Sequence, residues 1–304
     1  MLPTKNVPLE ELAAQIDVYA KVTDKIIAAL EKGTVPWHQP WKDGGAPQNL
    51  ISKRPYRGVN VLILQSGGHE HNLFLTYKQI RDIGASIRIG EKCYTIVYWN
   101  QAEKELEDAS GAQDKKAKFV LHYYSVYNIA QCENIPEDYL PKPSRIAEPI
   151  RACEDIVLCM PKPPKIKHTK QEAYYHPIKD YINMPKQASF ESDAAYYSAL
   201  FHELIHSTGH QSRLNRKSLT DFPTVEAYSQ EELVAEIGAC YLQNKTGIPG
   251  MIDNSTAYIQ GWLTKLRNDK RLIFFAAGQA QRATDYILNV KNEPEDMVQG
   301  KEVN

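Results

Sequence analysis

The sequence contains few cysteines, and no two of them are spaced as a pair. Its 304 residues include five cysteines, an odd number, and no C-x-x-C motif. These features exclude a disulfide framework and a cysteine zinc ribbon. Because disulfides form in oxidising compartments, a chain without paired cysteines is typical of the reducing cytosol. We therefore expect a cytoplasmic protein.

Long hydrophobic runs are also missing. The mean hydropathy is -0.48, and the longest apolar runs, such as residues 272–277, fall far short of the roughly 18 residues that span a bilayer. Glu10 and Glu11 interrupt the N-terminus where a signal peptide would have an unbroken apolar stretch. The sequence therefore excludes a transmembrane protein, and we expect neither a membrane partner nor export.

The chain as a whole lacks an excess of positive charge, but one segment is basic. The net charge is -1, which excludes a protein that is basic throughout. Residues 42–92 nevertheless carry eight lysines and arginines against four acids, with aromatic residues interspersed. This combination is typical of surfaces that hold single-stranded nucleic acid by charge and stacking. The candidate DNA-binding residues are Trp37, Trp41, Lys53, Arg54, Tyr56, Arg57, Tyr77, Lys78 and Arg81.

A second interpretation of this segment stays open. The aromatic residues can fill a small hydrophobic core, and the charged residues can form an ordinary solvated face. An excess of four positive charges is modest, so composition alone favours this second interpretation.

Length and proline content divide the chain into two parts. A chain of 304 residues corresponds to about two domains. Four prolines fall between residues 136 and 149, as in a linker. We place the boundary near residue 140, which gives domains 1–140 and 141–304.

The first part is predicted to mix helices and strands. Apolar residues recur at three- and four-residue steps over residues 8–32, which indicates a helix that ends before Gly33. The remaining predicted elements are a helix or strand over 59–64, a helix over 76–83, strands over 93–99 and 119–129, and a mobile hairpin loop over 100–118.

The second part is predicted to be mostly helical. Its predicted elements are helices over 146–160, 192–208, 225–245 and 256–290, the last broken near 268–270, and an extended segment over 174–184. The predicted fold class is therefore α+β, with a mixed α/β first domain and a mostly helical second domain that has a small sheet.

The motif H-E-x-x-H in the second part indicates a metal site. His202 and His206 are four residues apart on a predicted helix, so both imidazoles lie on one face and can reach one Zn²⁺. Glu203 can then act as general base on a metal-bound water. The alternative is two unligated histidines on a buried helix, which would be costly beside a glutamate.

The next predicted helix offers a third ligand. Glu232 and Glu236 are also four residues apart and can face one point. This spacing resembles that of gluzincins, so we assign Glu232 as a ligand and Glu236 as a partner that holds a ligand histidine. Glu231 and Glu226 stay open as alternative ligands, and so does a solvated acidic face.

Other positions near the motif are less well defined. His210 follows Gly209, which is expected to end the helix, so His210 need not face the metal. Ser212 stands where metzincins have their third ligand, which excludes that class. The extended segment 174–184 precedes the metal-binding helix, where zincins place the edge strand that binds peptide. The candidates for stabilising an oxyanion are His210, Tyr228 and Tyr241, and the sequence does not choose among them.

Taken together, these motifs resemble one family, the ArdC-type antirestriction proteins of conjugative plasmids and mobile elements. The resemblance covers nearly the whole chain. It is carried by residues 26–33, 36–37, 40–41, 56–60 and 74–77 in the first part, and by residues 182–185, 201–210, 213–214 and 231–236 in the second.

The resemblance implies a single-stranded DNA-binding domain followed by a zincin-like metallopeptidase domain, for which the spacing of Glu232 and Glu236 indicates the gluzincin type. It also implies that the protein protects incoming plasmid DNA from host restriction during conjugation. We expect one Zn²⁺ per chain, with Mn²⁺ as an alternative, and two partners, single-stranded DNA and an unidentified protein or peptide.

Three rival functions are retained. One is a general zinc metallopeptidase whose N-terminal domain recognises protein. Another is a DNA-binding protein with a structural metal, against which Glu203 argues because a structural site needs no general base. The weakest is a DNA-cutting metalloenzyme.

Overall fold

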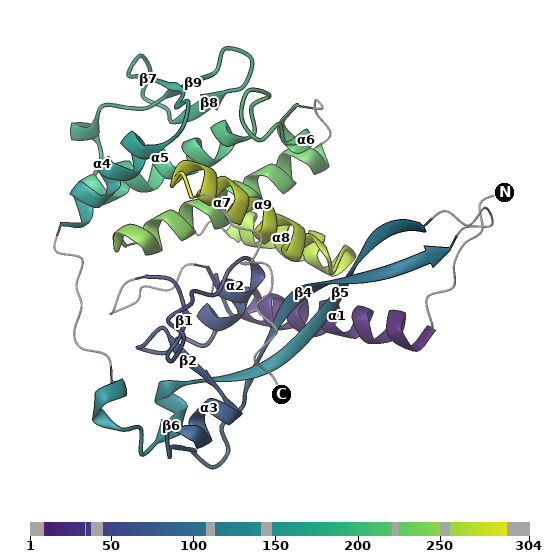
Figure 1. Ribbon diagram of the computed structural model, residues 1–304. Helices are drawn as coiled ribbons and strands as arrows, with labels where there is room; N and C mark the ends of the chain where they lie inside the picture. The colour runs from purple at the N-terminus through teal and green to yellow at the C-terminus, as the bar shows by residue number, and fades with distance from the viewer. Residues whose placement is uncertain are drawn as a thin grey trace.

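The computed structural model describes residues 9–33, 35–37, 45–107, 113–140, 148–220, 225–249 and 256–290. Helices and strands both contribute, and the predicted α+β class is confirmed (Figure 1). No helix within these ranges is long and apolar enough to cross a membrane.

The first part of the chain forms a four-stranded sheet with helices beside it. Its helices are α1 (Leu9–Glu31), α2 (Val59–Gln65) and α3 (Tyr77–Asp82). Its strands are β1 (Gln48–Asn49), β2 (Leu73–Thr76), β3 (Ser86–Ile87), β4 (Tyr94–Glu107), β5 (Gln113–Asn128) and β6 (Cys132–Glu133). The sheet order is β1-β2-β5-β4, and β3 pairs separately with β6. The ambiguous run after Gly58 is a helix, α2.

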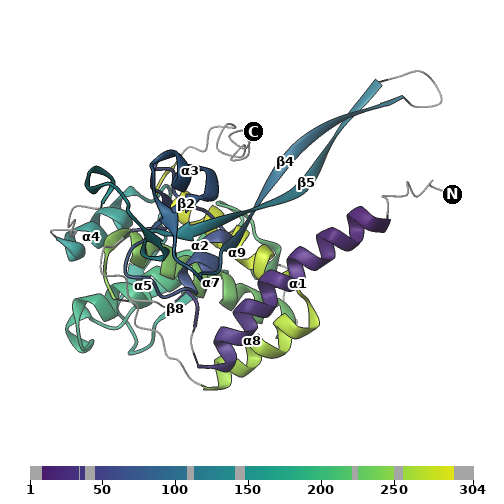
Figure 2. The ribbon, with the colours of Figure 1, turned by 90° about the horizontal axis from the view of Figure 1, so that it is seen from below.

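The predicted hairpin loop over residues 100–118 is wrong for residues 100–107 and 113–118, which are strand, while residues 108–112 lie outside the described ranges. Strands β4 and β5 stay paired from Tyr94 opposite Val126 to Glu107 opposite Gln113. This two-stranded ribbon projects away from the rest of the protein (Figure 2). A projecting ribbon has no core to face, so its sequence needs no alternation of apolar and polar residues, and the charged composition concealed the strands.

The second part is a helical layer with a small sheet at one end. Its helices are α4 (Pro149–Cys159), α5 (Asp193–Thr208), α6 (Lys217–Thr220), α7 (Val225–Thr246), α8 (Thr256–Asn268) and α9 (Leu272–Ile287). Its strands are β7 (Lys165–Lys167), β8 (Tyr174–His176) and β9 (Tyr181–Asn183), in the order β7-β9-β8. The predicted break before α9 is confirmed. The predicted extended segment 174–184 is instead a hairpin, β8–β9, which turns at Asp180, a residue with φ 48°.

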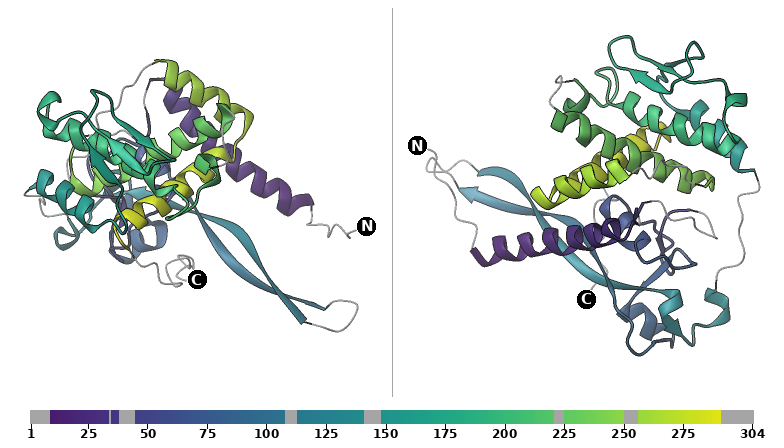
Figure 3. Two further views of the ribbon diagram at one scale, coloured as in Figure 1. Left: turned by 90° about the horizontal axis from the view of Figure 1, so that it is seen from above. Right: turned by 180° about the vertical axis from the view of Figure 1, so that it is seen from behind.

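The two parts share one hydrophobic core. A single cluster of buried side chains runs from Val18 on α1 to Ile287 on α9, and α1 lies along α8 (Figures 2 and 3). Trp37 is completely buried, with its ring centroid 5.3 Å from that of Trp262. The boundary near residue 140 stays a prediction, and a fragment cut there would expose much of this core to water.

Candidate metal centre and nucleic-acid surface

Helix α5 carries the two histidines of the motif on one face. The Ser192 hydroxyl accepts a hydrogen bond from the backbone N–H of Ala195 at 3.1 Å, which fixes the start of the helix. One turn apart, His202 and His206 have ring centroids 4.7 Å apart, and their Nε2 atoms are 3.0 Å apart. Both Nε2 atoms therefore point to the same place, as the spacing predicted.

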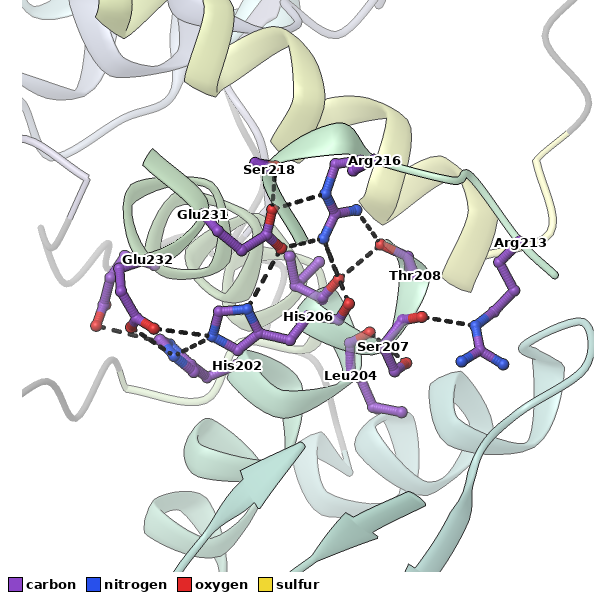
Figure 4. Close-up of polar contacts among 12 residues, drawn as sticks. His202, Leu204, His206, Ser207, Thr208, Arg213, Arg216, Ser218, Glu231 and Glu232 are labelled. Carbon is purple, nitrogen blue, oxygen red and sulfur yellow. Dashed lines mark hydrogen bonds and ion pairs between the residues drawn. The ribbon is translucent and has the colours of Figure 1, made fainter. Parts of the chain in front are cut away.

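Helix α7 brings Glu232 to this place. One carboxylate oxygen lies 3.4 Å from Nε2 of His202, and the other lies 3.5 Å from Nε2 of His206 (Figure 4). Gly238 of α7 packs directly against Ile205 of α5, where a Cβ would lie 2.6 Å from Cδ1 of Ile205. A side chain at this position would force the Ile205 side chain to move.

The three donors fit a divalent metal ion. Their ligand atoms all lie within 4.8 Å of one another. Two donors at about 2.0–2.2 Å from one tetrahedral ion are about 3.4 Å apart, which is close to the separations observed here. Two imidazole nitrogens and one carboxylate also form the donor set that catalytic zinc sites use.

The charges around the donors favour a cation. Burial alone would lower the pKa of His202, but hydrogen bonding to Glu232 and the charges of Glu236 and Glu203 raise it to about 9. One Glu236 oxygen lies 3.6 Å from Nδ1 of His202. Its other oxygen is buried and has no hydrogen-bond partner among the described residues. Several carboxylates thus converge on two imidazoles, an arrangement that a bound cation stabilises.

Glu231 occupies a different position from Glu232. It lies 3.3 Å from Nδ1 of His206, on the opposite side of the ring from the donor cluster. Burial would raise its pKa, but hydrogen bonds from His206 and Arg216 lower it to about 2. Glu231 therefore supports His206 from behind, and its position makes it a poor alternative to Glu232 as a ligand. The side chain of the other alternative, Glu226, lies outside the described residues.

Glu203 is buried in the same region, with 8% of its surface exposed. It lies near enough to His202 for its charge to raise the pKa of that imidazole. Burial raises the pKa of Glu236, and the charge of Glu203 adds to that increase. Glu203 is therefore beside the donor cluster without being one of its three donors, as its predicted role as a general base requires.

The three candidates for stabilising an oxyanion differ in what their side chains contact. Tyr241 donates its hydroxyl to the carbonyl of Gly58 at 2.8 Å and is buried against the first part of the chain, so it is not available. Nδ1 of His210 lies 2.8 Å from the Ser212 hydroxyl. The side chain of Tyr228 lies outside the described residues.

In the first part, a turn and a short helix form an exposed basic surface. Lys53 and Arg54 are exposed on a turn whose backbone N–H groups bind the Asn49 side chain. Asn49 also donates to the side chain of Gln79 on α3 at 2.8 Å, which fixes the turn beside this helix. Helix α3 exposes three further candidates, Tyr77, Lys78 and Arg81, with 58% of Tyr77 accessible.

Three candidates lie elsewhere, and for the two aromatic ones the prediction is wrong, whereas Arg57 stays a prediction. Trp37 is 0% exposed and Tyr56 is 4% exposed, so neither ring can stack on a base in this conformation. Arg57 is partly exposed but forms an ion pair with Asp285 of α9. Trp41 lies outside the described residues. Ile51, which the sequence did not single out, is 41% exposed on the same turn as Lys53.

Family models match the chain on both sides of residue 140. Residues 158–279 match a zincin-like metallopeptidase, and residues 16–127 match the N-terminal domain of anti-restriction factor ArdC. The class of the second part is therefore a zincin-like metallopeptidase domain, in agreement with its histidine and glutamate donors.

The chain belongs to the ArdC antirestriction family. Crystal structures of the antirestriction ArdC protein from the R388 plasmid, one metal-free and one Mn(II)-bound, are 37% identical, each with a TM-score of 0.72. The metal-free match covers 89% of this chain and 96% of that one. Protein y4eC of Sinorhizobium fredii is 33% identical over 89% of this chain and 91% of its own length. The chain also matches two DNA primases TraC of Escherichia coli at 31% and 32% identity, spanning 19% and 27% of their lengths.

Proposed function

We propose that this protein binds single-stranded DNA and protects incoming plasmid DNA from host restriction during conjugation. The observation that carries the proposal is the match to the R388 antirestriction protein, which extends over 96% of that chain. The relatives named as DNA primases support DNA as a partner.

The DNA surface that we propose consists of the turn and helix α3. Lys53, Arg54, Lys78 and Arg81 supply positive charge for phosphates, and the exposed ring of Tyr77 supplies a stacking platform. Such a surface holds a flexible strand without reading its sequence, because every base has a face that can stack.

We further propose that His202, His206 and Glu232 hold one divalent ion. Zn²⁺ suits this donor set, and the Mn(II)-bound relative makes Mn²⁺ the other ion to test. Titration calorimetry of the metal-free protein with each ion tests the site. Heat of binding at a stoichiometry of about one, lost in Glu232→Ala, is the expected result.

The chemistry that we propose for this site is peptide-bond hydrolysis. When bound, the ion supplies Lewis acidity towards a carbonyl oxygen and towards water. The carboxylate of Glu203 accepts a proton from the attacking water and then delivers it to the leaving amine nitrogen. Glu236 and Glu231 keep the imidazoles of His202 and His206 in place by facing their Nδ1 atoms.

The DNA partner is tested with labelled single- and double-stranded oligonucleotides of equal length, at two salt concentrations. The full chain is required, because the first part shares its core with the second. Much tighter binding to the single-stranded than to the double-stranded oligonucleotide, with an affinity that falls as the salt concentration rises, supports the proposal. Binding to neither form would leave a metallopeptidase-like protein whose N-terminal domain recognises protein.

A further inference from the structure

Two buried arginines follow the metal-binding helix, three residues apart. The side chains of Arg213 and Arg216 are 1% and 3% exposed. Each donates hydrogen bonds to carbonyl groups near the C-terminal end of α5, and each forms an ion pair with one carboxylate. Buried arginines are rare unless they are paired in this way. The two differ in what their carboxylates contact.

Arg213 connects α5 to the small sheet. It donates to the carbonyl of Ser207 at 2.6 Å and to that of Lys162 at 3.1 Å. Its carboxylate partner is Asp180, in the turn between β8 and β9, which also accepts a hydrogen bond from the hydroxyl of Tyr175. None of these groups is a donor of the metal cluster.

Arg216 connects α5 to α7, the helix of Glu232. Its Nη2 donates to the carbonyl of Ile205 at 2.8 Å. Its Nε donates to Oε2 of Glu231 at 3.1 Å, and its Nη2 contacts Oε1 of the same carboxylate, so the guanidinium binds both oxygens (Figure 4). Ser218 donates a further hydrogen bond to Oε2 of Glu231 at 2.6 Å.

Glu231 is thereby fixed behind a ligand histidine. Its Oε1 lies 3.3 Å from Nδ1 of His206. A carboxylate that is paired with a guanidinium only accepts hydrogen bonds, so the proton of this contact belongs to Nδ1 of His206. The other ring nitrogen, Nε2, lies 3.5 Å from Glu232 and 3.0 Å from His202, so Glu231 holds the ring with Nε2 turned towards the donor cluster.

We propose that Arg216 is a positioning residue for metal binding, acting through Glu231 to hold His206 in the orientation that a metal requires. This inference rests on the proposed metal site. It predicts that metal affinity depends on the two-point contact of the guanidinium with Glu231, and not on the positive charge alone, because lysine cannot bind both carboxylate oxygens in the same way.

The test compares Arg216→Lys with the matched variant Arg213→Lys. Both substitutions keep the positive charge but remove a buried guanidinium that binds a carbonyl of α5 and a carboxylate. Both are therefore expected to lower the melting temperature of the metal-free protein. The dissociation constant for Zn²⁺ and for Mn²⁺ is measured by calorimetry on the full chain. Arg216→Lys is expected to weaken binding about 10- to 100-fold, as is usual for residues that orient a metal ligand. Arg213→Lys is expected to leave the dissociation constant within about twofold, because it does not reach a donor.

Equal weakening in both variants would overturn the inference, because the effect would then come from loosening α5 as a whole. If wild-type protein binds metal and Arg216→Lys binds it with unchanged affinity, the inference is overturned while the proposed metal site stands. If wild-type protein binds neither ion, the proposed site is wrong and the inference falls with it.

A second variant covers the case in which Arg216→Lys does not fold. Glu231→Gln preserves the size of the side chain but removes the charge that Arg216 holds behind His206, so it is expected to reduce metal affinity in the same direction as Arg216→Lys. Metal affinity in Glu231→Gln equal to that of wild-type protein would overturn the inference.

Discussion

The metal cluster and the basic surface of the first part are both predicted from residue types, but the observed geometry agrees with the two predictions to different extents. At the metal cluster, His202 and His206 converge with Glu232. In the first part, Trp37 and Tyr56 are buried, while Tyr77 is exposed on α3. A spacing of four residues on one helix fixes a geometry, whereas a collection of aromatic and basic residues leaves open which of them face solvent.

The largest effect is expected at the metal cluster, from Glu203→Ala. This change removes the proposed general base, so any peptide hydrolysis should fall about 100- to 10,000-fold. The metal content should stay at the wild-type level, because Glu203 is not one of the three donors. Hydrolysis of a peptide mixture and elemental analysis of the same sample measure the two quantities. The exposed acid Glu191 supplies a control, Glu191→Ala. Activity that survives in Glu203→Ala would mean that another group moves the proton.

A second test separates core aromatics from surface aromatics. Trp37→Ala should lower the free energy of unfolding by about 3–5 kcal/mol, the usual cost of deleting a large buried ring. Tyr77→Ala, at an exposed position, should change it by only about 0.5 kcal/mol. Urea unfolding of both full-length variants measures the difference. Similar stabilities for the two variants would show that Trp37 is not part of the shared core.

The third test concerns stacking on the exposed ring. Tyr77→Ala should weaken binding to a single-stranded oligonucleotide by about 1–3 kcal/mol, the usual value of one stacked base. Tyr123, 59% exposed on β5, gives a control of equal exposure, Tyr123→Ala. Fluorescence anisotropy with one labelled oligonucleotide compares the two. Equal losses would move the DNA surface away from α3.

The fourth test concerns charge. Lys78→Gln and Arg81→Gln should each reduce the slope of log affinity against log salt by about 0.7, since each removes about one phosphate contact to a single strand. Lys245, exposed at the end of α7, supplies the control Lys245→Gln. Slopes that stay at the wild-type value in all three variants would exclude α3 as a phosphate-binding element.

The smallest effect is expected from pH. Burial would raise the pKa of Asp180, but hydrogen bonds from Arg213 and Tyr175 lower it below its ordinary value of 3.8. A carboxyl with a lowered pKa in the folded state stabilises the protein above its ordinary pKa, and this contribution is lost as the pH falls through the lowered value. The stability of Asp180→Asn should therefore depend less on pH below about 4 than that of wild-type protein. Melting curves between pH 5 and pH 2 measure this, and parallel profiles would show that the pair contributes nothing.

Much of the second part could be predicted from the sequence. The helices that became α5 and α7 were predicted close to their observed bounds, and each is followed directly by a glycine, Gly209 or Gly247, a residue that commonly ends a helix. Strands β4 and β5 were predicted too short, because the outer part of a projecting ribbon carries no apolar pattern. The hairpin β8–β9 was missed because its strands have only three residues each.

The supporting groups of the site were harder to predict. His206 contacts Glu231, which is 25 positions away in the sequence, and Glu231 in turn binds Arg216, which is 10 positions from the histidine. No motif spacing indicates such contacts. Of the two carboxylates that face the Nδ1 atoms of the histidines, the sequence spacing assigns a supporting role only to Glu236. For Glu231 the sequence offers the role of an alternative ligand.

The sequence by itself determined the two imidazoles on one helical face, the adjacent general-base candidate Glu203, and the family to which the chain belongs. These properties depend on local spacing and on the order of motifs, and both are written in the chain. Only the tertiary structure decided that Glu232 meets both histidines while Glu231 lies behind one of them, and that Trp37 fills a core shared by the two parts. The physical reason is that neighbouring residues on one helix point in different directions, so which of them meets a given partner depends on how the helices pack.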